Sequence, residues 1–349
     1  MDINTLNSTD LSTLRGMIDN ARKVVIFSHT KPDGDALGSS LGLMHYLLKK
    51  GKTAVSVVPD QFPDFLHWLP GNEQVLRYDR HWKKALDAID AADLICCLDF
   101  NDMGRVEAVR HAIEKSNAKV LVIDHHESPT VPADLLVSRP QMSSTCELLF
   151  RLLWQLGEFE VIDKKIATCI YCGMMTDTGG FTYNSTDPAI FFIISQLLTT
   201  GIDKDKIYRN VYHNFSASRM HLLGYILYEK LQVTESGNAS YYTLSREDML
   251  RFNFKRGDAE GIVNLPLQIK GLKMSISMRE DTEKDNAIWV SLRSVDDYSC
   301  IDVAEKFFNG GGHINAAGGH LDCSLAEAEE VAKQAIAYFE STLQKPEKS

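Results

Sequence analysis

The first half of the chain alternates short, almost continuously apolar runs with segments whose apolar residues recur every three or four positions. Such runs are typical of parallel strands covered on both faces, and the spaced pattern is typical of amphipathic helices. The expected strands are residues 23–28, 53–58, 93–99, 119–124 and 133–138, with helices between them at 37–50 and 105–116. This alternation predicts an α/β domain built on a doubly wound, mainly parallel five-stranded sheet.

The pattern changes along the second half of the chain. Residues 143–175 and 188–231 have mostly helical periodicity, whereas strands are expected at 239–245, 272–280 and 287–294, with helices at 300–308 and 324–343. We therefore expect a smaller α+β C-terminal domain joined to the first by a helical connector. The expected bounds are 12–188 for the first domain, 189–235 for the connector and 236–343 for the second domain.

Composition and charge limit the location and the ligands of the protein. The chain has 349 residues and 44% apolar content, enough for two soluble cores. The polar N-terminus lacks the features of a secretory signal, and the apolar stretch at 189–198 is too short for a membrane span, so we expect a cytoplasmic protein without a membrane partner. A net charge of −10 disfavours long duplex nucleic acid but allows a short nucleotide ligand.

The seven cysteines do not suggest a disulfide framework, because the number is odd and no secretory signal is present. Cys96 and Cys97 lie within an expected core strand, where cysteine behaves as a small apolar residue. Cys169 and Cys172 have the spacing of a metal-binding pair, but no second such pair completes a zinc site. We expect both of them to pack in the core of a helix.

Acidic and imidazole side chains gather where the expected strands end. The ligands of parallel sheets bind at the carboxyl ends of the strands, so residues at these ends meet at one edge. Four carboxylates at one edge repel each other unless cations neutralise them, which predicts more than one metal ion. The candidate residues are His29, Asp33 and Asp35 after the first strand, Asp99 after the third, Asp124, His125 and His126 after the fourth, and Asp177 in a glycine-rich turn.

The mixture of carboxylate and imidazole ligands suits Mn²⁺, Fe²⁺, Co²⁺ or Mg²⁺. Two such ions that share a carboxylate activate a water for in-line attack on phosphorus. Asp99 stands alone at the end of its strand and is the expected shared ligand. A single Asp or His at a strand end is usually a loop-capping residue, so the metal hypothesis depends on the coincidence of all these segments at one edge.

The second domain contains the glycine-rich segment "FFNGGGHINAAGGH" at residues 307–320. Its accessible backbone N–H groups are expected to cradle a phosphate, with His313 as a donor and Arg293 as a fork that grips phosphate in two places. The alternative is a tight turn between a helix and a strand, although three successive glycines cost more entropy than a turn requires. The expected substrate-binding set is His126, Arg293, Ser294, Gly310, Gly311, Gly312 and His313.

The motifs "SHTKPDGDALGSS", "LDFND", "DHH" and "TDTGGF", followed by "GGGH", resemble those of the DHH phosphoesterase superfamily with its accessory DHHA1 domain. The resemblance covers residues 12–343, and the layout is most similar to the bacterial nanoRNase and 3′-phosphoadenosine-5′-phosphate phosphatase group. It implies a Mn²⁺-dependent hydrolase, with Mg²⁺ or Co²⁺ as alternatives, that degrades very short RNA to mononucleotides and removes the 3′-phosphate of phosphoadenosine phosphate. A homodimer is left open.

By the same resemblance, His29, Asp33 and Asp99 hold one ion, while Asp35, Asp99, His125 and Asp177 hold the other. His126 then faces the substrate, where it donates to a phosphate oxygen as charge develops. We expect Asp124 to accept a hydrogen bond from the metal ligand His125 and to fix its tautomer. The expected catalytic residues are therefore Asp99, Asp124 and His126.

Three other functions remain in view. The first is a phosphodiesterase for cyclic di-AMP or a linear dinucleotide, which uses the same metal site. The second is a pyrophosphatase, disfavoured because no cluster of Lys and Arg surrounds Arg293. The third is a nucleotide-sensing module that has lost the reaction, which is less expected because the chain keeps every ligand that two ions need.

Overall fold

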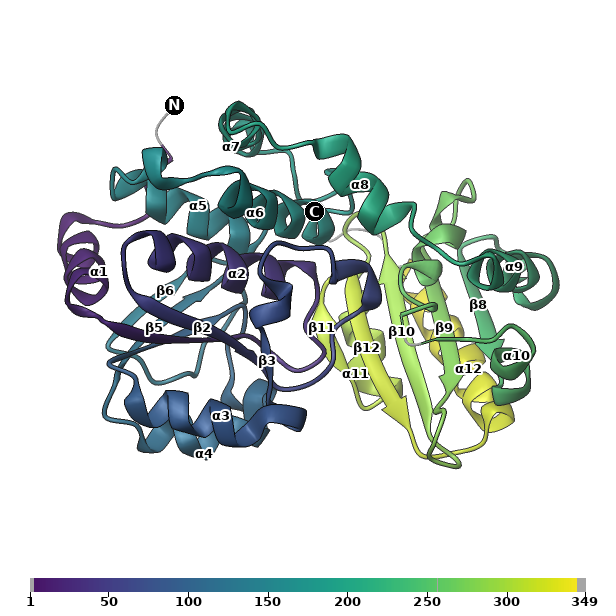
Figure 1. Ribbon diagram of the computed structural model, residues 1–349. Coiled ribbons are helices and arrows are strands. Elements are labelled where there is room, and N and C mark those ends of the chain that lie inside the picture. Colours follow the sequence, from purple (N-terminus) through teal and green to yellow (C-terminus); the bar gives the residue numbers. More distant parts are fainter. Residues whose placement is uncertain (1–2, 256, 344–349) are drawn as a thin grey trace. The chain divides into compact units, whose positions relative to one another are not determined.

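The computed structural model describes residues 3–255 and 257–343. The chain consists of two compact units, Met1–Asn214 and Phe215–Ser349 (Figure 1). The division at Asn214 lies inside the segment 189–235 that was expected to be a connector. Among the described residues, no helix is both long enough and apolar enough to cross a membrane.

A six-stranded parallel sheet forms the centre of the first unit, in the order β3-β2-β1-β4-β5-β6. The predicted doubly wound parallel sheet is confirmed, with one strand more than expected. The additional strand β3 has only two residues, too few to produce a recognisable apolar pattern. The strands are β1 Lys23–Phe27, β2 Thr53–Val58, β3 Leu76–Arg77, β4 Leu94–Leu98, β5 Lys119–Asp124 and β6 Leu135–Ser138.

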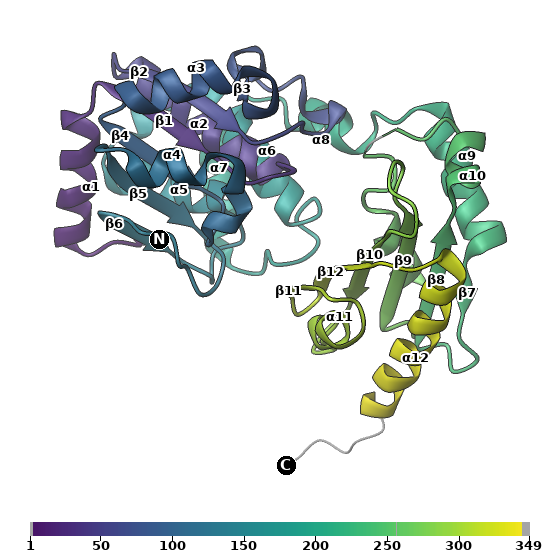
Figure 2. The ribbon, with the colours of Figure 1, turned by 90° about the horizontal axis from the view of Figure 1, so that it is seen from below.

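Helices cover both faces of this sheet. Figures 1 and 2 show α3 and α4 on one face, with α2, α5 and α6 on the other. Ile26 packs in the cluster that contains α2, whereas Val25 and Phe27 pack against α3 and α4, so neighbouring residues of β1 enter different cores. The helices are α1 Ser8–Asn20, α2 Gly34–Lys49, α3 Tyr78–Ala91, α4 Glu107–Lys115, α5 Thr145–Gln155, α6 Lys164–Asp177, α7 Pro188–Thr199 and α8 Lys204–Tyr212, with short helices η1 Asp64–Leu66, η2 Asn72–Gln74, η3 Met103–Val106 and η4 Phe159–Val161.

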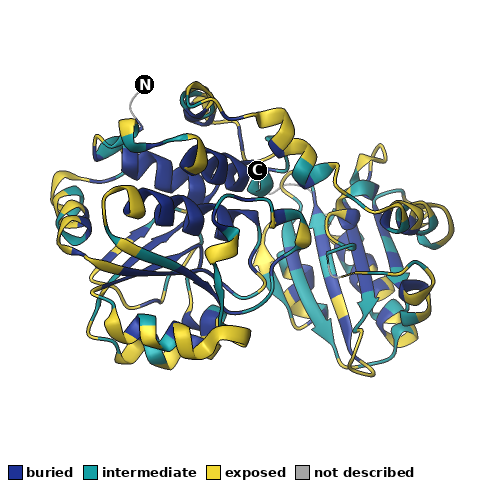
Figure 3. Ribbon diagram, viewed as in Figure 1, coloured by how far each residue is buried: buried dark blue, intermediate teal, exposed yellow. Residues whose placement is uncertain are grey.

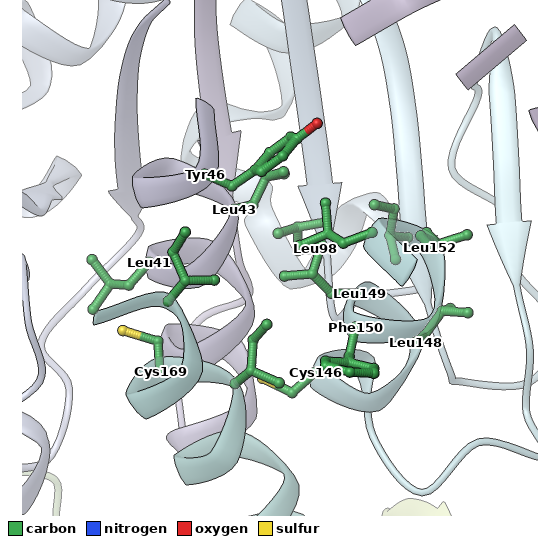
Figure 4. Close-up of a cluster of buried hydrophobic side chains, with 14 of the residues drawn as sticks. Leu41, Leu43, Tyr46, Leu98, Cys146, Leu148, Leu149, Phe150, Leu152 and Cys169 are labelled. Atoms are coloured by element: carbon green, nitrogen blue, oxygen red, sulfur yellow. The ribbon is translucent and has the colours of Figure 1, made fainter. Parts of the chain in front are cut away.

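The buried faces of α2, α5 and α6 meet in the largest core of the first unit (Figure 4). Cys169 and Cys172 are fully buried within α6, which agrees with their predicted packing role. Cys96 and Cys97 are likewise buried in β4. All seven cysteines are free thiols.

The second unit contains a mixed sheet in the order β11-β12-β10-β9-β8-β7 (Figure 2), in which only the β8–β9 pair is parallel. The predicted α+β character is confirmed, and β11 and β12 were not anticipated. The strands are β7 Gln232–Val233, β8 Ala239–Leu244, β9 Met274–Glu280, β10 Ile288–Ser294, β11 Gly311–His313 and β12 Ala316–Leu321. The helices are α9 Ala217–Tyr225, η5 Ile226–Lys230, α10 Arg246–Arg251, η6 Ile262–Gln268, α11 Ile301–Phe307 and α12 Leu325–Leu343.

Candidate metal centre

The candidate site lies at the carboxyl ends of β1, β4 and β5. β1 pairs with β2 on one side and with β4 on the other. The chain therefore first adds strands to one side of β1 and then crosses to its other side, so the strand order reverses between β1 and β4. Loops diverge at such a switch point and leave room for a ligand. His29 follows β1, Asp99 follows β4, and His125 follows β5, so all three reach this one edge.

His29, Asp33 and Asp99 form the first group of potential metal ligands. His29 Nε2 lies 3.9 Å from Asp33 Oδ2 and 3.4 Å from Asp99 Oδ2. Asp33 caps the N-terminus of α2, where its Oδ1 accepts hydrogen bonds from the N–H groups of Asp35 and Ala36, so Oδ2 is directed to His29. His29 Nδ1 lies 2.7 Å from the Thr30 carbonyl oxygen, which fixes the proton on Nδ1 and leaves Nε2 as a metal donor.

Asp35, His125 and Asp177 form the second group. His125 Nε2 lies 4.0 Å from Asp35 Oδ2 and 3.3 Å from Asp177 Oδ2. Asp35 is held by the N-terminus of α5, because its two oxygens accept hydrogen bonds from the backbone N–H groups of Thr145 at 2.6 Å and Cys146 at 2.9 Å. Asp177 is the last residue of α6, so it belongs to the helix itself rather than to the following turn.

Asp99 lies between the two groups and presents one carboxylate oxygen to each. Its Oδ2 is 3.4 Å from His29 Nε2, and its Oδ1 is 3.6 Å from His125 Nε2. The backbone of Asp99 has φ +65°, a left-handed conformation that aspartate tolerates better than most residues and that is enriched at functional sites. The Thr145 hydroxyl donates to Oδ1 at 3.0 Å and so helps to fix the carboxylate. This arrangement suits a ligand shared by two ions.

The electrostatics of the cluster favour a bound cation. Burial, and then the negative charges of Asp99 and Asp33, raise the pKa of Asp35 well above its usual value. Burial and the same kind of repulsion raise the pKa of Asp177. Burial would also raise the pKa of Asp99, but the hydrogen bond with His29 and the neighbouring imidazoles bring it below its usual value. Oxygen and imidazole donors at these spacings fit hard or intermediate divalent ions.

The prediction that Asp124 orients His125 is wrong. Asp124 Oδ1 lies 2.7 Å from Nδ1 of His126, whereas Nδ1 of His125 lies 3.3 Å from the Met142 carbonyl oxygen. His126 Nδ1 also lies 3.9 Å from Asp99 Oδ1, so both histidines are beside this carboxylate. The fully buried carboxylate of Asp124 therefore supports His126, and the Met142 backbone contacts the expected metal ligand His125.

Arg293 and His313 lie on one face of the second sheet. Both residues pair with Ala316 of the intervening strand β12, and directly paired residues of antiparallel strands share a face. Ser294 faces the opposite side, where it is 6% exposed and its hydroxyl donates to the Tyr298 carbonyl oxygen. The expectation that the Ser294 side chain contacts substrate is therefore not supported.

The glycine segment is an edge strand rather than the expected concave loop. Residues Gly311–His313 form β11, and the chain returns as β12 in a hairpin. A Cβ atom at Gly310 would lie 1.9 Å from the Gly318 carbonyl oxygen, and one at Gly312 would lie 2.5 Å from that of Ala316. These two glycines are explained by close backbone approach, which is nearer to the structural alternative. A Cβ at Gly311 would meet no atom within 4 Å, so local packing does not explain that glycine.

The residues that hold Asp35 and Asp99 were missed in the sequence. The N–H groups of Thr145 and Cys146 and the Thr145 hydroxyl come from the start of α5, which Ser144 caps through a hydrogen bond from the Glu147 N–H. The signal was present, since "SSTCE" has a serine three residues before a glutamate, as N-caps often do. What the sequence does not contain is the packing that brings this cap to Asp35.

Comparison with known proteins gives matches along the whole chain. The profile of the DHH family, N-terminal domain, matches residues 23–174, and that of the DHHA1 domain matches residues 238–345. The bifunctional oligoribonuclease and PAP phosphatase NrnA of Thermus thermophilus is 28% identical over 315 residues, which cover 90% of this chain and 89% of that protein. The cyclic-di-AMP phosphodiesterase PdeA of Listeria monocytogenes is 28% identical over 93% of this chain, but the match covers only 48% of PdeA.

One solved structure is similar over almost its full length. The crystal structure of an exopolyphosphatase-related protein from Bacteroides fragilis matches with a TM-score of 0.93 and 45% sequence identity. The match covers 97% of this chain and 98% of that one.

Proposed function

Because the chain belongs to the DHH family of phosphoesterases and carries a DHHA1 domain, we propose that it hydrolyses very short oligoribonucleotides to mononucleotides and removes the 3′-phosphate of 3′-phosphoadenosine 5′-phosphate. The observation that carries the proposal is the position of Asp99 between the two ligand groups. The T. thermophilus relative, which this chain matches over both domains, is named for both of these activities.

The proposed cofactor is a pair of divalent ions, with Mn²⁺ preferred. His29, Asp33 and Asp99 would hold one ion, and Asp35, Asp99, His125 and Asp177 would hold the other. When bound, such ions activate water and neutralise charge on the phosphate. The protein's own contribution is to hold these side chains in place on strand ends and helix ends.

His126 is the proposed phosphate-facing residue of the first unit. Asp124 accepts a hydrogen bond from its Nδ1 at 2.7 Å, so in the protonated form of the ring Nε2–H is the donor to a non-bridging phosphate oxygen. The buried carboxylate also stabilises the imidazolium form as negative charge develops on the phosphate. In the second unit, Arg293 and His313 are proposed to bind the substrate from the face that they share.

Cleavage of cyclic di-AMP or of a linear dinucleotide is the second candidate function. The observation in its favour is the similarity to the L. monocytogenes phosphodiesterase. This chain spans about half of that relative, at 48% of its length. The similarity therefore supports phosphodiester hydrolysis more strongly than it supports cyclic di-AMP as the substrate.

The test is a panel of hydrolysis rates with Mn²⁺ on phosphoadenosine phosphate, RNA of two to five nucleotides, RNA of about twenty nucleotides, cyclic di-AMP and pyrophosphate. We expect the first two substrates to give the highest kcat/KM, because a net charge of −10 disfavours the long polyanion. A control variant, Asp90→Asn, changes an exposed carboxylate on α3 and should keep the same ranking. A faster rate on cyclic di-AMP would select the second candidate, and activity that survives chelation of all metal would contradict both.

A further inference from the structure

Arg105 is a cationic residue that the metal centre described above does not use. It belongs to the short helix η3, six residues after Asp99 in the chain. Its carbonyl oxygen accepts a hydrogen bond of 2.8 Å from the N–H of Thr30, the residue next to His29. The backbone of Arg105 is thereby fixed beside the loop that supplies the first ligand group.

The segment that carries Arg105 is fixed on its other side as well. Asp102 caps η3 by accepting from the Gly104 N–H at 2.7 Å, and it also accepts from the Thr130 hydroxyl at 2.8 Å. The Thr130 N–H donates to the Asn101 carbonyl oxygen at 2.7 Å. Since Thr130 lies in the loop after β5, the loops that follow β1, β4 and β5 are tied together around Arg105.

The guanidinium of Arg105 has no partner in the part of the chain that the structure describes, since it makes neither a hydrogen bond nor an ion pair there. The Arg105 side chain is half-buried. Arg110, on the next helix, pairs instead with Glu114 at 2.8 Å. An arginine whose backbone lies beside the first ligand group, and whose side chain pairs with none of the described carboxylates, keeps its five N–H donors available for an anion.

We propose that Arg105 binds a phosphate oxygen of the substrate beside the His29 group of the metal centre. A guanidinium is a planar fork that matches phosphate in two places, and a fixed backbone reduces the entropy lost on binding. The inference rests on the proposed function only in that the substrate is a phosphate ester. The phosphate is either the one that is hydrolysed or a second phosphate of the same substrate, as in phosphoadenosine phosphate.

The first experiment measures the binding of inorganic phosphate to the Mn²⁺-loaded full chain by calorimetry. Arg105→Ala should weaken this binding by about tenfold or more. The phosphate affinity of Arg105→Lys should lie between those of Arg105→Ala and the wild type, because lysine keeps the charge but loses the planar guanidinium. Arg110→Ala, which removes an exposed arginine of α4 from its ion pairs, is the matched control and should bind phosphate as the wild type does.

The second experiment compares kcat/KM for 3′-AMP and for phosphoadenosine phosphate. An equal loss for both substrates in Arg105→Ala assigns Arg105 to the phosphate that is hydrolysed, whereas a loss for phosphoadenosine phosphate alone assigns it to the second phosphate. The Mn²⁺ content and the Tm of the variant should be those of the wild type, which a merely structural role would not predict.

Unchanged phosphate affinity in Arg105→Ala, or loss of bound Mn²⁺ from that variant, would overturn the proposal. Its failure is distinct from failure of the proposed function. A wild-type protein that binds phosphate through Arg105 but hydrolyses neither nucleotide would contradict the proposed substrates and leave the role of Arg105 intact.

Discussion

Three consecutive residues at the end of β5, Asp124, His125 and His126, have different side-chain partners. Asp124 and His126 are two positions apart and contact each other, while His125 points to the carboxylates of Asp35, Asp99 and Asp177. Within three positions, the end of β5 and the loop after it thus provide a hydrogen-bonded Asp–His pair, proposed to face the phosphate, and a histidine proposed to bind metal.

Asp124→Asn tests this division, because it keeps the shape of the side chain and removes the charge that supports His126. We expect kcat to fall by about 100-fold or more, as when a preorganised donor is lost from an active site. The Mn²⁺ content should not change, since the His125 side chain contacts the Met142 backbone rather than Asp124. Kinetics and metal analysis on one preparation measure both quantities, and a variant that loses Mn²⁺ would return Asp124 to the role first predicted for it.

The residue types at the site were predictable, and their partners were not. The expected metal ligands follow a strand, begin α2 or end α6 near one sheet edge, so the pattern of strands and nearby acids was enough to nominate them. The partner of Asp124 depends on side-chain direction beyond the end of the strand. The hydrogen bonds from Thr145 and Cys146 to Asp35 depend on tertiary packing between segments 110 and 111 residues apart in the chain.

Among the elements, helices α2 and α6 cross in close contact, and both carry residues of the site. A Cβ atom at Gly38 of α2 would lie 2.6 Å from the Cys169 carbonyl oxygen of α6, and one at Gly173 of α6 would lie 3.1 Å from the Cα atom of Asp35 in α2. α2 begins beside Asp33 and Asp35, and α6 ends at Asp177. The distance between these helices therefore sets the spacing between Asp35 and Asp177 in the second group.

Gly38→Ala should destabilise the protein by about 1–3 kcal/mol, because the added methyl group meets backbone that has no room to move. Gly16→Ala in α1 is the matched control, since a Cβ there meets no atom within 4 Å, and alanine in a helix should stabilise by about 0.5–1 kcal/mol. Urea denaturation of the metal-free proteins measures both changes. Equal midpoints for Gly38→Ala and the wild type would show that the helix crossing tolerates expansion.

The strands that the sequence failed to predict are short or rich in glycine. β3 has two residues, and β11 consists of two glycines and His313, so neither contains an apolar alternation. At Gly310 and Gly312 the neighbouring backbone of the hairpin leaves no room for a side chain. From the sequence alone, glycines required for this reason look the same as glycines of a phosphate-binding loop. Most of the longer strands, and the helices α2, α4, α11 and α12, were predicted within a few residues of their ends, whereas the full-length helices α1 and α3 were not predicted.

At the scale of the whole molecule, the chemistry is divided between two units. All proposed metal ligands belong to the first unit, and Arg293 and His313 belong to the second. The order of the motifs along the chain already indicated this division, because the strand-end acids precede the glycine segment by more than a hundred residues. Family membership then indicates the class of reaction, which is phosphoester hydrolysis.

The central claim is that Asp99 joins two metal sites in one centre, and Mn²⁺ stoichiometry tests it most directly. Calorimetric titration and metal analysis should give two Mn²⁺ per chain for the wild type, and electron paramagnetic resonance should show two magnetically coupled ions. Asp99→Asn should weaken both sites by more than the roughly 10–100-fold that loss of an outer partner causes, and should remove the coupling. The Asp90→Asn control should keep both ions. A wild type that binds one ion, or an Asp99→Asn variant that keeps two coupled ions, would contradict the account.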